Sequence, residues 1–318
     1  VHSHAMLFAN TPTLKNGVEK FGSACIACKS TTGTKLLNEQ GLAAFSLPWD
    51  QISESVDWYD CQLCHEDGTP GAPLKYGGMA ATEFGSTLLD SIDPKQAVCG
   101  QCHNYYGAVY TRGGLMEKMQ SGEVDVNSVD PYRYGTDPDS LLKAALEDGY
   151  ELVTDQETGQ GSVHEQLGMA CVDCHSAKET DENGNEYQSH DFSSSPLEHE
   201  ESLEYCLTCH SSQGIETTDQ MKDFVHNAQQ EVADLEATFY EKQATLKDLV
   251  ASAVKNGGVD EATLDKAREN YTRGTWYVRY SDGGGDFKGM KVAHNPEAEK
   301  SYVQRATVLM DEAIAMLS

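Results

Sequence analysis

The stretch Cys171-Val172-Asp173-Cys174-His175 sets the pattern for the whole chain. Two cysteines separated by two residues, with a histidine directly after the second, occur three more times: Cys61 and Cys64 before His65, Cys99 and Cys102 before His103, and Cys206 and Cys209 before His210. A fifth pair, Cys25-Ile26-Ala27-Cys28-Lys29, has lysine in the place of the histidine. All 10 cysteines of the chain belong to these five pairs, so none is left over.

The spacing Cys-x-x-Cys-His is the signature of covalent haem attachment in c-type cytochromes. The two thiols lie one helical turn apart and add to the two vinyl groups of the porphyrin, and the adjacent histidine ligates the iron. Structural zinc, disulfides and redox-active thiol pairs also use paired cysteines, but none of them needs a histidine after four of five pairs. We therefore predict five covalently attached haem c groups.

Covalent haem attachment takes place outside the cytoplasm, so we expect an extracytoplasmic protein, whether periplasmic, secreted or at the cell surface. No signal peptide is visible, and Val1 is expected to begin a processed mature form. No stretch approaches the roughly 18 apolar residues of a membrane span.

The composition excludes one large class of function. The chain has 318 residues, with 51 Asp and Glu against 23 Lys and Arg and a formal charge of −28. Binding to nucleic-acid phosphates requires clustered basic residues, so we expect no nucleic-acid partner.

Hydrophobic residues make up only 39% of the chain, which is low for a folded protein of this size. Five porphyrins would supply the missing apolar core.

The pair that ends in Lys29 predicts a different kind of haem. A lysine amine has a reference pKa of about 10.4 and ligates iron only after losing its proton to burial and the metal. If Lys29 is the proximal ligand, the opposite face of that iron is open to a substrate, whereas an iron between two histidines only passes electrons. The alternative is a degenerate motif without haem.

The order of motifs, one with lysine followed by four with histidine, resembles that of the pentahaem, ammonia-forming cytochrome c nitrite reductases. Two stretches strengthen the resemblance: Cys-Gly-Gln-Cys-His-Asn-Tyr-Tyr at 99–106 and Ala-Cys-Val-Asp-Cys-His at 170–175. The similarity runs from about His4 to the C-terminus, although family members usually have a longer N-terminal region. We predict a divergent, shortened member of this family.

The proximal iron ligands are then Lys29, His65, His103, His175 and His210. The resemblance places the distal ligands at His4, His164, His190 and His294. His2 is the rival of His4, because the spacing to the first motif fits neither perfectly. For His199 and His226 a surface or packing role is favoured. The sequence leaves open which distal histidine serves which haem.

Around the open haem face the resemblance is incomplete. Tyr106 matches a tyrosine of the family and is a candidate proton donor; its alternative role is to pack against haem. Lys15, in Leu14-Lys15-Asn16-Gly17, stands where the family has arginine and keeps only the positive charge. The family's Lys-x-Gln-His segment falls on residues 151–155, and no histidine occurs between His103 and His164. We therefore predict Lys29, Tyr106 and Lys15 as the catalytic residues of an altered pocket.

The calcium site of the family has lost its ligands as well. Tyr105 replaces the family glutamate beside the tyrosine, and the lysine and glutamine of the missing segment are absent. We expect no calcium at that site.

The chain falls into two regions, which we expect to form one continuous structural unit. Residues 1–213 carry the haem motifs, and residues 214–318 have the apolar spacing of long helices. We expect three such helices: one at 217–254, one from an N-cap at Asp260 to about Tyr280, and one from Asn295-Pro296 onward. The fold expected is mainly α, with little β structure. The C-terminal helices either cover the haem region of a monomer or form a homodimer, as in the family.

Two functions remain open. In the first, electrons pass through the bis-histidine haems to the Lys29 iron, where a small nitrogen oxyanion is reduced, the donor being another redox protein or a quinol-oxidising cytochrome. Residues 1–40 have a net charge of +2 and the others −30, a difference that could attract an anion or arise by chance. In the second, the protein is a non-catalytic electron wire that serves a partner reductase or an extracellular acceptor, and its acidic surface suits a basic partner.

Overall fold

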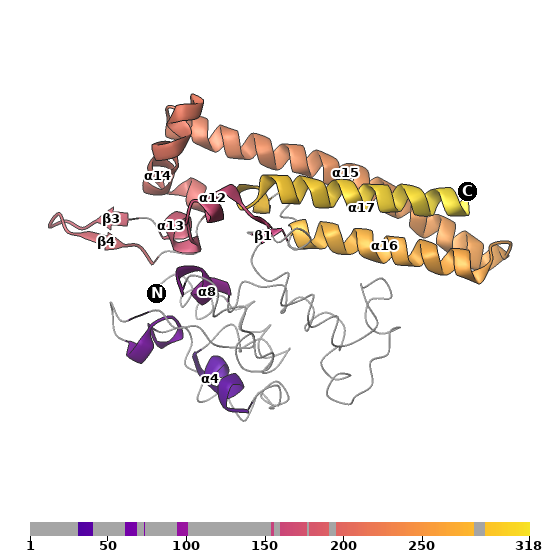
Figure 1. Ribbon diagram of the computed structural model, residues 1–318, viewed down its shortest axis with the longest axis horizontal. Helices are drawn as coiled ribbons and strands as arrows, with labels where there is room; N and C mark the ends of the chain where they lie inside the picture. Colours follow the sequence, from indigo (N-terminus) through magenta and orange to yellow (C-terminus); the bar gives the residue numbers. More distant parts are fainter. Residues whose placement is uncertain are drawn as a thin grey trace. The chain divides into compact units, whose positions relative to one another are not determined.

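The structure is a computed structural model, and it describes residues 31–40, 61–68, 73, 94–100, 154–155, 160–176, 178–190, 195–282 and 290–318. Helices predominate in these ranges, as predicted, and the strands among them are two or three residues long (Figure 1). The chain divides into two compact units, one of Val1–His103 with Gly168–Lys222 and one of Asn104–Leu167 with Asp223–Ser318. The division of the sequence after residue 213 stays a prediction.

The first unit contains α4 (Thr31–Gln40), η2 (Cys61–Leu63), η3 (Glu66–Gly68), α8 (Pro94–Gly100), α13 (Cys171–His175), β3 (Lys178–Thr180), β4 (Glu186–Gln188), η4 (Pro196–Glu198), α14 (Glu200–His210) and η5 (Ser211–Gln213). The helices named here have at most 11 residues. Strands β3 and β4 form an antiparallel hairpin in which Glu179 pairs with Tyr187. The hairpin turn is closed by the Asp181 carboxylate, which accepts hydrogen bonds of 2.8 Å from the backbone N–H groups of Asn183 and Asn185.

The second unit contains β1 (Thr154–Asp155), β2 (Gln160–Gly161), α12 (Val163–Gln166), most of α15 (Thr218–Asn256), α16 (Glu261–Asp282), η6 (Met290–Ala293) and α17 (Pro296–Leu317). The three long helices lie where the apolar spacing predicted them. Asp260 caps α16 by accepting from Thr263 N–H at 3.0 Å, and Asn295 caps α17 by accepting from Ala298 N–H at 3.2 Å. The predicted Gly283 to Gly285 loop lies outside the described residues.

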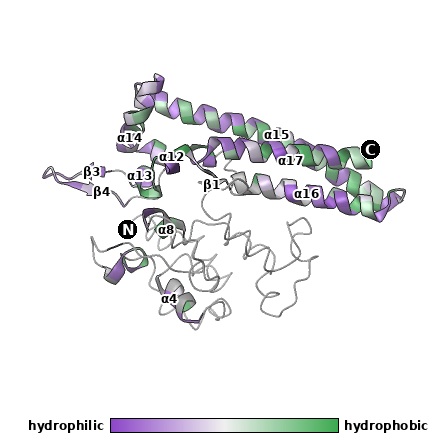
Figure 2. Ribbon diagram, in the orientation of Figure 1, coloured by the Kyte–Doolittle hydropathy of each residue, from purple (hydrophilic) through white to green (hydrophobic). Residues whose placement is uncertain are grey.

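The long helix α15 buries one side and ends at a pair of glycines. Val232, Phe239 and Leu246 lie seven residues apart and are each fully buried. Hydrophobic and hydrophilic residues alternate along α15, α16 and α17 in Figure 2, as expected of helices with one buried side. Gly257 has a φ of 69°, a left-handed conformation that glycine adopts readily, and it ends the helix directly after Asn256.

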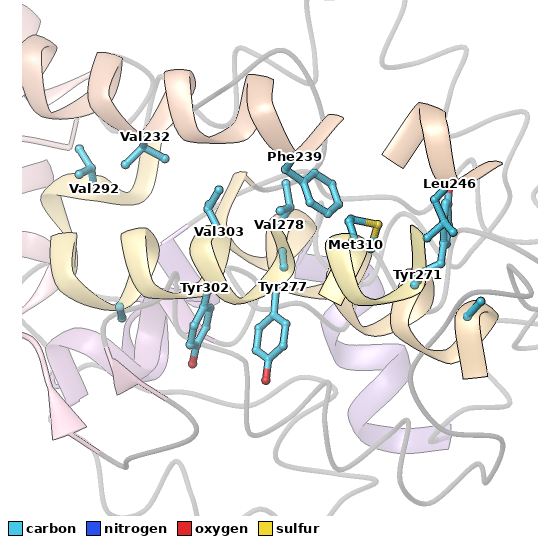
Figure 3. Close-up of a cluster of buried hydrophobic side chains, with 14 residues drawn as sticks. Val232, Phe239, Leu246, Tyr271, Tyr277, Val278, Val292, Tyr302, Val303 and Met310 are labelled. Carbon is cyan, nitrogen blue, oxygen red and sulfur yellow. The ribbon is translucent and has the colours of Figure 1, made fainter. Parts of the chain in front are cut away.

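The three long helices share one hydrophobic core. Figure 3 shows Val232, Phe239 and Leu246 of α15 near side chains from α16 and α17, among them Met310. Lys300 pairs with Glu231, and Lys242 pairs with Asp311, so α15 and α17 run in the same direction.

Helix α16 runs antiparallel to α17 and packs closely against it. Tyr277 of α16 contacts Tyr302, with ring centres 5.3 Å apart, whereas the earlier Asn270 donates to the later Glu312. At Gly274 a Cβ atom would lie 2.4 Å from Met310 Cε and 3.1 Å from the carbonyl oxygen of Ala306. The absence of a side chain at residue 274 therefore permits this close approach.

Candidate haem-binding site

Haem attachment requires each Cys-x-x-Cys-His motif to form a tight turn that places both sulfurs on one side. At the second motif the N–H of His65 donates to the carbonyl of Cys61 at 2.9 Å, within the turn that follows η2. At the fourth motif the whole sequence from Cys171 to His175 is the helix α13. The fifth motif, from Cys206 to His210, forms the C-terminal end of α14. These three motifs thus adopt the one-turn geometry that two thioether bonds to one porphyrin need.

The motifs of the first unit lie close to one another. Helix α8, which carries Cys99, packs against α13, and the Cys99 thiol is within hydrogen-bonding reach of Cys171. Ser202 of α14 donates to the carbonyl of Cys174 at 3.1 Å, which joins the fourth and fifth motifs. Lys35 of α4 donates to Gln62 at 2.8 Å, so the helix that follows the lysine motif contacts the second motif.

Two thiols of this unit lie in surroundings that favour their protonated form. Burial, with smaller contributions from Cys206 and Asp173, raises the pKa of Cys174 to about 12. A hydrogen bond with Cys171 and burial raise the pKa of Cys99 well above its usual range. The cysteines that the structure describes form no disulfide bonds.

Cys209 differs from the other predicted attachment cysteines in the described ranges. It is exposed, whereas the others, Cys206 of the same motif among them, are half-buried. The reason is its place near the end of α14 among polar residues: its Sγ lies 3.8 Å from the Thr208 hydroxyl, and its carbonyl accepts from the Ser212 hydroxyl at 2.8 Å. An exposed thiol is accessible to a porphyrin vinyl group, but the protein itself does not enclose it. Attachment of haem at Cys209 therefore stays a prediction from the motif.

A predicted proximal ligand and a predicted distal ligand face each other in the first unit. The ring centres of His65 and His190 lie 6.4 Å apart, with 40° between the ring planes. A metal–imidazole bond is about 2 Å long, so two imidazoles on opposite sides of one iron have centres about 6 Å apart. The two histidines therefore fit the axial positions of one haem, the one attached at Cys61 and Cys64.

Two of the predicted distal histidines have an acceptor beside Nδ1. In His190 this atom lies 3.0 Å from the carbonyl oxygen of Gln188, and in His164 it lies 3.1 Å from that of Ala293. An N–H group at Nδ1 can donate to such a carbonyl, which orients the ring and leaves Nε2 for iron. Burial lowers the pKa of His190, which favours the neutral imidazole that iron binds. The carbonyls of Gln188 and Ala293 were not foreseen, because backbone acceptors leave no signal in the sequence.

The other described histidines lie at the ends or on the surface of helices, and their predicted roles stay predictions. His210 ends α14 with Nδ1 3.3 Å from Oε1 of Gln213, and His294 follows η6 directly. His226 is exposed on α15, as expected of a surface residue. His199 is half-buried between η4 and α14, and its Nε2 is buried without a hydrogen-bond partner among the described residues.

Several predicted site residues lie outside the described ranges. They are His2, His4, Lys15, Cys25, Cys28, Lys29, Cys102, His103, Tyr105 and Tyr106. The site of the lysine-ligated iron, its catalytic residues and the family calcium site therefore stay predictions from the sequence. Of the segment in which the family carries an additional histidine, the described part is strand β1, where Thr154 pairs with Gly161.

Comparison with known proteins decides the family. The sequence profile of the family described as cytochrome c552 matches residues 4–318. The chain belongs to the cytochrome c552 family. This is the family of the cytochrome c nitrite reductases, as the order of the five motifs indicated. The cytochrome is thus a haem protein of the c type, as predicted, and the attachment of haem at each cysteine pair stays a prediction.

A solved structure shows that the fold is shared as well. The cytochrome is similar to NrfA, the catalytic subunit of cytochrome c nitrite reductase from Desulfovibrio desulfuricans ATCC 27774, a structure described for its two calcium sites. The TM-score is 0.65 at 18% sequence identity, and the match covers 93% of this chain and 65% of that one. The chain therefore spans less than two thirds of the length of this neighbour. At this identity the likeness establishes the fold and leaves the reaction to be argued.

Proposed function

We propose that this cytochrome is an oxidoreductase that reduces a small nitrogen oxyanion, nitrite above all, at an iron ligated by Lys29. The observation that carries the proposal is the Cys25-x-x-Cys28-Lys29 motif in a member of the nitrite reductase family. The facing pair His65 and His190 supports it, because an iron held between two histidines passes electrons, whereas an iron with one side-chain ligand can bind a substrate.

Each residue has a distinct task in this proposal. When bound, the haems would pass on the electrons of the external donor and supply the iron to which the oxyanion binds. Lys29, as a neutral amine, would hold that iron from one side and leave the other side free. The ammonium group of Lys15 would stabilise the negative charge of the substrate, and the Tyr106 hydroxyl would donate a proton as nitrogen–oxygen bonds break.

A second candidate function is electron transfer without catalysis. It is favoured by the altered pocket: Lys15 stands in place of arginine, and the family histidine is missing from the segment that contains strand β1. In that case the iron next to Lys29 would carry a second side-chain ligand or be blocked. The chain would then pass electrons to a partner reductase or an extracellular acceptor.

Reduction of nitrite to ammonium with a low-potential dye as donor tests the first function. We expect ammonium from the wild type and a rate at least about 100-fold lower for Tyr106→Phe, which removes the proton donor. A wild-type protein that turns over neither nitrite, hydroxylamine nor sulfite would overturn the proposal. A high-spin ferric signal that responds to nitrite or cyanide would instead rule out the electron wire.

The setting of the reaction is part of the proposal. Covalent haem attachment supports an extracytoplasmic location, and none of the helices in the described ranges has the length and apolar character needed to cross a bilayer. The donor would be another redox protein or a quinol-oxidising cytochrome.

A homodimer through the C-terminal helices is supported by Val308 and Met316, which lie eight residues apart on α17 and remain 55% and 39% exposed. Sedimentation of Val308→Glu against the wild type tests it, with a monomeric variant expected.

A further inference from the structure

A buried hydrogen bond connects the segments that carry two predicted iron ligands. Ser176, directly after His175, donates from Oγ to the carbonyl oxygen of Ser189, directly before His190. Both serines are buried, with 2% and 6% of their surface exposed. A bond inside the protein interior is costly to leave unmade, so it holds the two segments in one arrangement.

A second contact strengthens the same connection. The side-chain amide of Gln188 donates to the carbonyl of Val172 in α13 at 3.3 Å, and the carbonyl of Gln188 faces Nδ1 of His190. The helix α13 also contains the fourth attachment motif. The segment that precedes His190 is therefore connected to α13 and to the residue after it through the side chains of Gln188 and Ser176.

The second unit has a connection of the same kind. Nδ1 of His164 lies 3.1 Å from the carbonyl oxygen of Ala293, the residue directly before His294. Here too one predicted ligand, His164, contacts the residue that precedes another predicted ligand, His294.

The two predicted ligands in each connection, His175 with His190 and His164 with His294, belong to different irons. Each haem with a Cys-x-x-Cys-His motif takes its proximal ligand from that motif, so two distal histidines such as His164 and His294 cannot share an iron. His175 belongs to the motif at Cys171, whereas His190 faces His65 of the second motif. Each connection thus joins the ligand sets of two haems.

We propose that hydrogen bonds connect, two by two, the segments that carry the axial ligands of different haems. In this proposal Ser176 is a positioning residue for His190. The bond from Ser176 makes the geometry at the second-motif iron depend on the helix that holds the fourth-motif haem. Ligand orientation and outer hydrogen bonds tune an iron's reduction potential. Loss of the bond therefore changes two haems and leaves the others as they were. The proposal rests on the ligand assignments above and is independent of the substrate.

The experiment compares Ser176→Ala with the wild-type holoprotein by potentiometric titration and by electron paramagnetic resonance of the oxidised haems. We expect the midpoint potentials and low-spin signals of two of the five haems to shift, with full haem content. The matched control is Thr275→Val, which removes a buried hydroxyl that accepts from Gln243 in the three-helix core and is not adjacent to a predicted ligand. It should leave all five potentials unchanged.

Two results would overturn the proposal: five unchanged potentials in Ser176→Ala, or a uniform change of all five, which indicates general loosening. If Ser176→Ala does not retain its haems, Gln188→Ala is the milder variant, and it should shift the same two haems by less. Its failure to shift either haem would equally contradict the proposal. Nitrite turnover is no part of these measurements, so an inactive wild-type protein leaves their outcome interpretable.

Discussion

The imidazole of His190 faces that of His65 with 6.4 Å between the ring centres. One histidine comes from the second attachment motif and the other follows the β3–β4 hairpin, so only the fold brings them together. The separation is close to that expected of two axial ligands on one iron, so we propose that His190 serves the haem at Cys61 and Cys64. The pairing can be tested by counting the haems that change when each ligand is removed.

The first prediction is that His190→Ala converts one low-spin haem to the high-spin state, since its iron loses a strong axial ligand. His65→Ala should also alter one haem. If both histidines ligate one iron, the double variant should also alter one haem. If they ligate separate irons, the double variant should alter two haems. Electron paramagnetic resonance of the ferric protein counts the altered haems. His226→Ala, at an exposed position on α15, is the control and should change none.

The second prediction concerns the close contact of α16 and α17. Gly274→Val should destabilise the protein by about 1–3 kcal/mol, because the new side chain meets the fixed carbonyl oxygen of Ala306 and the end of Met310. Chemical denaturation followed by circular dichroism measures the change. Ala251→Val at an exposed position of α15 introduces the same side chain without this contact, and an equal loss there would attribute the effect to a β-branched residue in a helix alone.

The helices were foreseeable because their signals are local. A spacing of seven residues from Val232 to Leu246 and the caps Asp260 and Asn295 predicted the starts of α15, α16 and α17 and the ends of the first two to within two residues. The cysteine motifs likewise predicted the haem-binding class from spacing alone. Both kinds of signal concern residues close together in the sequence.

The pairing of ligands was not foreseeable, because it depends on contacts between distant segments. Nothing in the sequence near His190 indicates that it faces His65 rather than another proximal histidine. The partners of its ring and of His164 are backbone carbonyls, which every residue has. Only the folded backbone shows which carbonyl a ring reaches.

The third prediction separates buried from exposed aromatic residues on one helix. Phe239→Ala should cost about 3–5 kcal/mol, because Phe239 is fully buried in the three-helix core and its loss leaves a cavity. Phe224, on the same helix, is 45% exposed and should cost well under half as much when replaced by alanine. The free energies of unfolding of the two variants test this. Equal losses would mean that Phe239 is not part of the core.

The fourth prediction concerns the pH dependence of stability at the start of α16. Hydrogen bonds from the backbone N–H and the hydroxyl of Thr263 lower the pKa of Asp260 below its usual value of 3.8. The unfolded chain therefore binds a proton at this residue more readily than the folded protein does. The stabilisation is complete above the unfolded pKa and is lost as the pH falls through the folded one.

Thermal unfolding of Asp260→Ala and the wild type at about pH 7 and about pH 2 measures this dependence. The variant should unfold at a lower temperature at the higher pH, and the difference should shrink at the lower pH. Asp260→Asn keeps a capping oxygen without a titrating group, so at about pH 7 its unfolding temperature should lie between those of Asp260→Ala and the wild type. The prediction fails if the unfolding temperatures of Asp260→Ala and the wild type differ by the same amount at both pH values. In that case the charge of Asp260 does not stabilise α16.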